Sequence, residues 1–127
     1  MKKIKINIKE KKQKYTLIIG SNIISNFSNF VKKSNLRISK YFLLIDKNVP
    51  KKMVRLLVNS ISKHNKTIYY FDANEKNKVQ KKVDSIIDLL LKKKFSRSDC
   101  LVAVGGGITG DVAAYTASLF KRGMNFI

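Results

Sequence analysis

The 127-residue sequence is poor in cysteine, in acidic residues and in long apolar runs. Its one cysteine, Cys100, excludes an intramolecular disulfide framework and favours a reducing, cytoplasmic setting. No apolar run approaches the roughly 18 residues of a membrane span, so we expect no membrane partner. The first residues alternate, with Ile4, Ile6 and Ile8 between polar neighbours, and lack the apolar stretch of a signal peptide.

Acidic residues are so few that the formal net charge is +19, from 27 lysines and arginines against 8 acids. Such a balance suggests a nucleic-acid partner. However, only four of the basic residues are arginine, the side chain on which base readers depend, and the lysines are spread along the whole chain. The hydrophobic fraction of 44% is ordinary for a folded protein. We therefore expect solvated lysines on a folded domain and no dedicated, sequence-specific nucleic-acid site.

Apolar patterns predict a β-hairpin followed by alternating strands and helices. Period-two runs predict strands over 4–8 and 15–19, joined by a polar turn over 10–14. Further apolar runs predict strands over 42–45, 67–71 and 101–104, with another opening at 125–127. Spacings of three and four residues predict helices over 21–31, 50–61, 79–91 and 109–120. This alternation indicates an α/β fold, an open parallel sheet with helices on both faces. The residues expected to face the core from the second and third helices are Met53, Leu56, Leu57 and Ile61, then Val79, Val83, Ile86, Ile87, Leu90 and Leu91.

Glycines gather directly after the strand over 101–104. Gly105, Gly107 and Gly110 have the spacing of a dinucleotide-binding loop between a strand and a helix. Glycine lets the backbone turn tightly and approach a pyrophosphate, and free N–H groups at a helix start favour anionic oxygens. The same spacing fits a strand-to-helix turn that binds nothing. Asp111, expected in the first turn of the helix, is either a charge that suits the helix dipole or an acceptor for a ligand.

The run from Gly105 to Ile127 resembles the 3-dehydroquinate synthases, of the sugar-phosphate cyclase superfamily. The shared pattern is three glycines, two residues, Gly110-Asp111, a helix of small residues with an aromatic, then Arg122-Gly123 and a strand. The resemblance extends upstream over essentially the whole chain and covers about the first third of a typical family member. It implies that 1–127 is a truncated N-terminal NAD-binding domain, Rossmann-like, whose C-terminal helical metal-binding domain is absent.

The resemblance also implies a reaction. The family is a lyase of the shikimate pathway, which leads to chorismate and the aromatic amino acids. It converts 3-deoxy-D-arabino-heptulosonate 7-phosphate to 3-dehydroquinate and phosphate, by transient NAD⁺-dependent oxidation, phosphate elimination and ring closure. Family members are homodimers that use zinc or cobalt, held by one glutamate and two histidines beyond this segment. The one histidine here, His64, matches no ligand position and is expected at the surface.

The fragment is accordingly expected to bind NAD at most, with no catalytic residue, no metal ligand and no activity alone. Another sugar-phosphate cyclase and a non-catalytic nucleotide-binding module are the alternatives.

Site residues are carried over by the same resemblance. Asp46 and Asn48 match a pair that holds the adenosine ribose, although Asn48 also suits an N-cap before Pro50. In the loop after the strand over 67–71, Ala73-Asn74 replaces the usual Asp-Gly. The acidic and basic residues of this loop, Glu75 and Lys78, are either nucleotide contacts or a solvated pair with each other. The remaining assignments are Glu75 and Lys78 for that loop, Gly106, Gly107 and Ile108 for the pyrophosphate, Gly110 and Asp111 for the nicotinamide end, and Arg122 for the substrate phosphate, from the neighbouring subunit.

Overall fold

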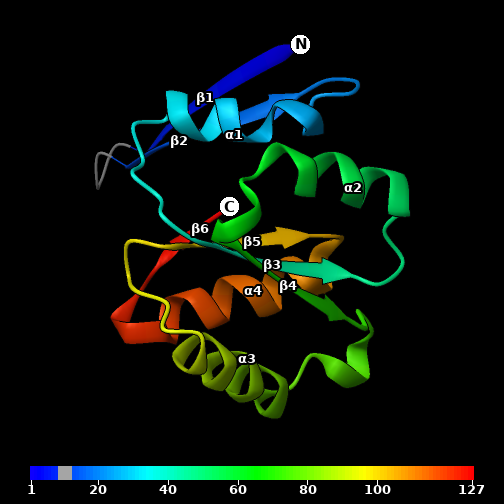
Figure 1. The fold of residues 1–127 in the computed structure, drawn as a ribbon, viewed down its shortest axis with the longest axis vertical. Coiled ribbons are helices and arrows are strands. Elements are labelled where there is room, and N and C mark those ends of the chain that lie inside the picture. The colour runs from blue at the N-terminus through cyan, green and yellow to red at the C-terminus, as the bar shows by residue number, and fades with distance from the viewer. Residues whose placement is uncertain (9–12) are drawn as a thin grey trace.

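The fold combines a two-stranded hairpin with a four-stranded parallel sheet (Figure 1). It is seen in a computed structural model that describes residues 1–8 and 13–127. The antiparallel hairpin consists of β1 (Lys2–Ile8) and β2 (Gln13–Ile19), with Ile4 opposite Leu17. The predicted strands are therefore confirmed, whereas most of the predicted turn over 10–14 lies outside the described residues, and the rest of it belongs to β2.

The parallel sheet has the order β4-β3-β5-β6. Its strands are β3 (Tyr41–Asp46), β4 (Lys66–Phe71), β5 (Cys100–Val104) and the short β6 (Asn125–Phe126). Four side chains in a row on β3 are fully buried because helices cover both faces of the sheet, as the continuous apolar run predicts. Those side chains are Phe42, Leu43, Leu44 and Ile45.

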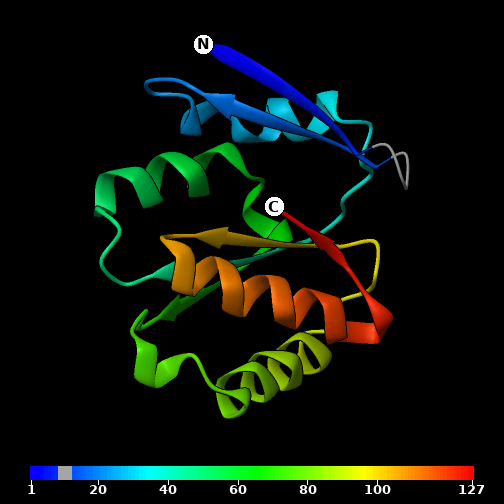
Figure 2. The same ribbon diagram turned by 180° about the vertical axis from the view of Figure 1, so that it is seen from behind.

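Helices cover the two faces in pairs (Figures 1 and 2). On one face, α2 (Lys51–Ser60) packs on Leu43 and Ile45, and α1 (Phe27–Lys33) adjoins it. On the other, α3 (Gln80–Lys92) and α4 (Gly107–Leu119) pack on Phe42 and Leu44. The alternation of β3 side chains between two cores confirms the predicted doubly covered sheet. Short 3₁₀ turns lie between these elements in the described residues: η1 (Ile24–Asn26), η2 (Lys63–Asn65), η3 (Glu75–Asn77) and η4 (Phe120–Arg122).

Several details of the helices differ from the predictions. The first helix begins as a 3₁₀ turn at Ile24 with no side-chain cap, not at Ser21. Pro50 occupies the N-cap of α2, and Asn48 makes no capping bond, since its amide turns back to Asp46. Three residues expected to face the core are exposed instead, because each lies at the edge of an apolar stripe or at a helix end: Met53, Val79 and Leu91. The fourth helix begins at Gly107, two residues before the predicted start.

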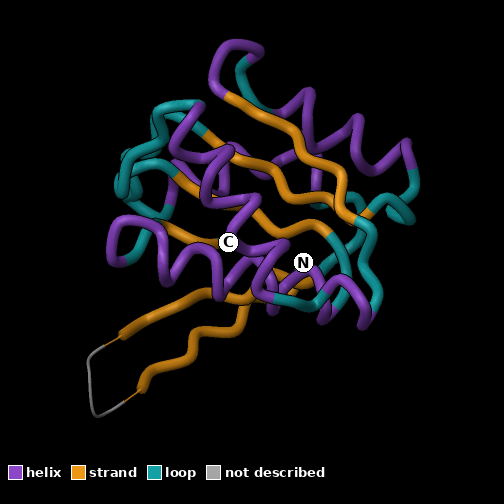
Figure 3. The backbone as a smooth tube through the Cα atoms, turned by 90° about the horizontal axis from the view of Figure 1, so that it is seen from below, coloured by secondary structure: helices purple, strands orange, loops and turns teal. Residues whose placement is uncertain are grey.

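The chain reverses its winding direction beside β3. It leaves β3 through α2 to β4 at the edge of the sheet, then returns through α3 to β5 on the other side of β3. The view in Figure 3 shows these strands side by side between the two helical layers. In open α/β sheets, ligands bind outside the carboxyl ends of the strands where the winding reverses. The ends of β3 and β5, paired at Ile45 and Val104, mark this place. No helix in the described residues is long and apolar enough to cross a membrane.

Candidate functional site

The end of β3 presents a preorganised carboxylate. Asp46 Oδ1 accepts hydrogen bonds from the Asn48 backbone N–H, at 3.0 Å, and from Asn48 Nδ2, at 3.1 Å. The Val49 N–H donates to the Asp46 carbonyl, which closes the turn. The two residues predicted to act as a pair are thus in direct contact at the carboxyl edge of the sheet.

The glycine turn after β5 lies against that carboxylate. A Cβ on Gly105 would come within 2.9 Å of Asp46 Cβ and 2.7 Å of Thr109 Oγ1, closer than real Cβ contacts come. Only glycine therefore lets the β5–α4 turn approach the end of β3 this closely. A Cβ on Gly106, Gly107 or Gly110 would meet nothing within 4 Å, so the backbone there is open to an approaching molecule.

The start of α4 offers backbone donors to the same space. Its first internal bond runs from the Gly110 N–H to the Gly106 carbonyl, and no side chain caps the helix. The amides of Gly107, Ile108 and Thr109 consequently have no acceptor within the helix. Such donors at the positive end of a helix dipole suit an anionic group.

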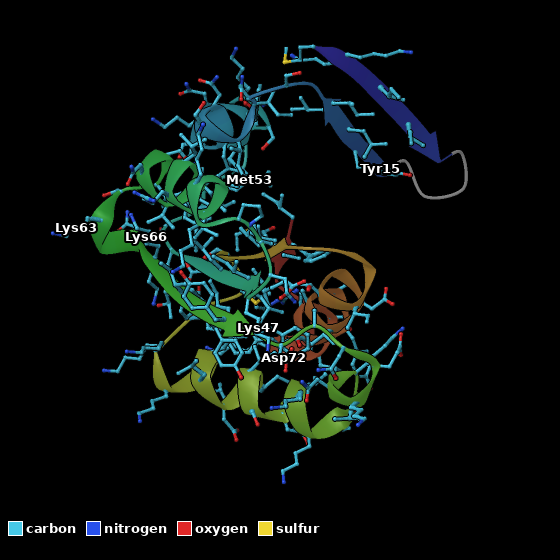
Figure 4. All side chains as sticks on the ribbon, turned by 90° about the vertical axis from the view of Figure 1, so that its right-hand side faces the viewer. Tyr15, Lys47, Met53, Lys63, Lys66 and Asp72 are labelled. Carbon is cyan, nitrogen blue, oxygen red and sulfur yellow. The ribbon has the colours of Figure 1, made fainter. Side chains whose placement is uncertain are left out.

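Two ion pairs cross the same edge. Lys78 Nζ lies 2.8 Å from Asp111 Oδ2, which links the loop before α3 to α4. The hydrogen bond and charge of Asp111 raise the pKa of Lys78 above its ordinary value. Lys47 Nζ lies 3.0 Å from Asp72 Oδ1, and Figure 4 shows the two side chains meeting beyond the ends of β3 and β4.

The predicted partners in the loop differ from those observed. Lys78 pairs with Asp111 rather than with Glu75, which is exposed in η3. Asp111 is the fifth residue of α4, so it lies beyond the first turn, where it was expected. The departure at Ala73-Asn74 has a structural consequence, because the Asn74 side chain accepts from the Asn77 N–H and caps η3. The loop thus has an ordered backbone without the usual Asp-Gly.

A cavity of about 270 Å³ opens beside the Lys78–Asp111 pair, between α3 and α4. Its lining surface is mostly apolar. The lining residues are Lys78, Val79, Gln80, Val83, Asp111, Val112 and Tyr115.

Arg122 is the predicted site residue that the fold keeps apart from the others. It follows α4, whose 13 residues run from the carboxyl edge of the sheet to the amino edge, a length of about 20 Å. Lys121 and Arg122 both have positive φ, 46° and 65°, and Arg122 is exposed. Arg122 therefore cannot reach the Asp46 and Gly105 cluster of its own chain.

Thr109 is a residue that sequence reasoning missed. Its side chain is fully buried, and within the described part of the chain Oγ1 has no hydrogen-bond partner. Buried hydroxyls are nearly always bonded, so this one marks an unusual position. Nothing in the sequence distinguishes Thr109 from the other small residues of its helix, so its buried, unbonded hydroxyl could not be predicted.

No three His, Cys, Asp or Glu side chains gather to hold a metal ion among the residues that the structure describes. The side chain of His64, expected at the surface, lies outside them. Burial raises the pKa of the Cys100 thiol to about 12, so this cysteine stays protonated and inert as a ligand near neutral pH.

Known proteins share both the sequence and the fold. A family model described as 3-dehydroquinate synthase N-terminal matches residues 68–127. The 3-dehydroquinate synthase of Pelagibacter ubique is 45% identical over 98% of this chain and 34% of its own length. That of Bartonella tribocorum is 32% identical over 96% of this chain and 34% of its own length.

A crystal structure of 2-deoxy-scyllo-inosose synthase, complexed with carbaglucose-6-phosphate, NAD⁺ and Co²⁺, has the same fold. The TM-score is 0.84 at 21% identity, over 98% of this chain and 34% of that one. The chain thus spans about a third of the length of the relatives it matches. In sequence, over nearly all its length, the chain is similar to about a third of the length of the 3-dehydroquinate synthases, and residues 68–127 match the N-terminal family model. In fold it is similar to about a third of 2-deoxy-scyllo-inosose synthase.

Proposed function

We propose that residues 1–127 form the NAD-binding part of a 3-dehydroquinate synthase. The observation that carries this proposal is the close approach of the Gly105 turn to Asp46 at the point where the winding reverses. It brings the Asp46 carboxylate, which could accept from ribose hydroxyls, close to an uncapped helix start, and both features suit a dinucleotide. The similar structure of 2-deoxy-scyllo-inosose synthase was solved with NAD⁺, which supports the choice of dinucleotide.

Each end of the dinucleotide has its own residues in this proposal. Asp46 and Asn48 hold the adenosine ribose, since a carboxylate accepts from both ribose hydroxyls. The amides of Gly106, Gly107 and Ile108 hold the pyrophosphate. Gly110 and Asp111 face the nicotinamide end, with Lys78 and Glu75 in the loop across it. The open space around Gly106, Gly107 and Gly110 suits that arrangement.

The reaction proposed for the whole enzyme is the conversion of 3-deoxy-D-arabino-heptulosonate 7-phosphate to 3-dehydroquinate and phosphate. NAD⁺ supplies the transient oxidation of one hydroxyl, and this chain's part is to bind and orient it. Arg122 binds the substrate phosphate of a second copy in a homodimer, because α4 separates it from its own site. Its planar guanidinium suits bidentate contact with phosphate.

The metal of the family does not fit the described residues, which offer no set of donors. No step of the proposal therefore passes through a metal, and we propose that the chain alone has no synthase activity.

Calorimetric titration of residues 1–127 with NAD⁺ tests the first part of the proposal. We expect saturable one-to-one binding, unchanged in Asp88→Ala, which removes an exposed acid of α3 outside the site. A cooperatively folded chain that takes up no NAD⁺ would contradict the proposal.

Activity is tested by exchange of the matching third of the Pelagibacter ubique enzyme for residues 1–127. The chimera should release phosphate from the substrate, whereas the chain alone should release none. An inactive chimera that folds and binds NAD⁺ would oppose the assigned reaction, while binding itself would stand.

A further inference from the structure

A buried hydroxyl lies under the proposed dinucleotide site without any bond to explain it. Thr109 is 0% exposed, and its Oγ1 has no partner in the described part of the chain. Burial of such a group without a hydrogen bond destabilises a fold. Valine has nearly the same shape without this penalty, so the hydroxyl points to a use other than packing.

Comparison with Thr116 in the same helix shows why Thr109 is unpaired. Thr116 is equally buried, and its Oγ1 donates to the Val112 carbonyl four residues earlier, at 2.7 Å. The residue four before Thr109 is Gly105, which lies outside α4 in the turn. Thr109 therefore lacks the usual intrahelical acceptor.

The Asp46 side chain lies across the Gly105 turn from Thr109. Thr109 Oγ1 and Asp46 Cβ lie within 2.7 Å and 2.9 Å of one point, the place of a Cβ on Gly105. Asp46 Oδ1 already accepts twice from Asn48, while Oδ2 accepts from none of the described residues. A carboxylate can accept about four hydrogen bonds, so a third protein donor and a ribose can share it.

We propose that Thr109 is a positioning residue of the dinucleotide site, whose hydroxyl donates to the Asp46 carboxylate when the ribose is bound. This inference rests on the proposed NAD⁺ binding and extends it to a residue that is not itself a contact. In that bound state the donor holds the carboxylate in one orientation, in which it accepts from both ribose hydroxyls. Bonds to charged groups are the stronger ones, so its loss should be measurable.

The experiment measures NAD⁺ affinity and thermal unfolding on residues 1–127 with Thr109→Val, Thr109→Ser and, as the matched control, Thr116→Val. Thr109→Val should raise the melting temperature by a few degrees, since an unpaired hydroxyl is removed. It should also weaken NAD⁺ binding about tenfold. Thr109→Ser should keep the affinity within about twofold because it keeps the hydroxyl, and Thr116→Val should leave the affinity unchanged.

Each other result has a definite meaning. Unchanged affinity in Thr109→Val overturns the inference and leaves NAD⁺ binding in place. Equal losses in the valine and serine variants also overturn it, because the packing of the intact threonine side chain, and not its hydroxyl, would then be what matters. A folded wild-type chain that does not bind NAD⁺ removes the proposed function and this inference with it.

Discussion

The two edges of the parallel sheet use their polar side chains in opposite ways. At the amino edge, the side chains of Lys40, Arg97, Asp99 and Lys121 are bonded to backbone. Asp99, 2% exposed, accepts from the N–H groups of Lys40 and Ser96, and Lys40 Nζ donates to the carbonyls of Lys93 and Lys94, directly after α3. Arg97 Nε and Lys121 Nζ tie the loops of this edge together through the carbonyls of Gly123 and Phe95.

At the carboxyl edge, several polar side chains bond to one another, and others lack a partner among the described residues. Asp46 bonds to Asn48, and Lys78 bonds to Asp111, both near the surface. The first amides of α4 have no acceptor within the helix, and Thr109 Oγ1 has no partner in the described residues. Bonded polar groups stabilise the amino edge, whereas the carboxyl edge keeps unbonded groups at some cost in stability, which fits the proposed dinucleotide site.

The largest predicted effect is a loss of stability caused by a substitution at the amino edge. Asp99→Ala leaves the partly buried N–H groups of Lys40 and Ser96 without their acceptor, so the free energy of unfolding should fall by roughly 3 kcal/mol. Urea unfolding followed by circular dichroism measures it, with Asp88→Ala as an exposed control that should change little. NAD⁺ affinity of the folded fraction should stay the same. A large loss of NAD⁺ affinity in Asp99→Ala, at unchanged stability, would contradict the contrast between the two edges.

Alanine substitutions should show that two glycines of the same turn have different roles, one in stability and one in binding. In Gly105→Ala the new Cβ would overlap Asp46 and Thr109, so unfolding free energy should fall by about 2 kcal/mol. In Gly107→Ala the new Cβ meets nothing, so stability should hold, while NAD⁺ binding weakens because the methyl group blocks the open backbone. Equal stability of the two variants would show that the Gly105 turn is not packed closely against the end of β3.

The sequence was sufficient for the elements but not for the relations between them. The run 42–45 predicts a doubly buried strand because its physics is local, and the structure agrees. The pairing of Lys78 with Asp111 depends on how α3 packs beside α4, which no spacing in the sequence encodes. Thr109 Oγ1 lacks a partner in the described residues because of where α4 begins. The exact first residue of a helix is hard to predict from the sequence. The sequence predicts Met53, Val79 and Leu91 in the core, but the structure exposes them. Tertiary packing decides which side of an apolar stripe is covered, and the sequence pattern does not encode this.

Asp46→Asn tests the carboxyl edge with a smaller change. The amide keeps the shape and an acceptor for Asn48 but loses the charge that ribose hydroxyls favour, so NAD⁺ affinity should fall about tenfold. Thermal stability should change little, because the side chain is partly exposed at the end of β3. Calorimetry gives the affinity and unfolding gives the stability. If the Asp46→Asn variant binds as tightly as the wild type, the ribose site must lie elsewhere.

The smallest predicted effect concerns the ion pair that joins the two helices at this edge. Asp111 raises the pKa of Lys78, so the charged pair favours the folded state at pH values below the ordinary lysine pKa. That contribution disappears as pH rises through the raised pKa of Lys78. In Asp111→Asn the Lys78 pKa, followed by NMR of its side-chain carbons, should fall back toward the ordinary value, with Lys47 as an internal reference paired elsewhere. Both side chains are largely solvated, so the change in stability should lie near the limit of measurement. An unchanged Lys78 pKa would mean that the two residues do not pair in solution, and the carboxyl edge would then hold one more unpaired charge for a ligand.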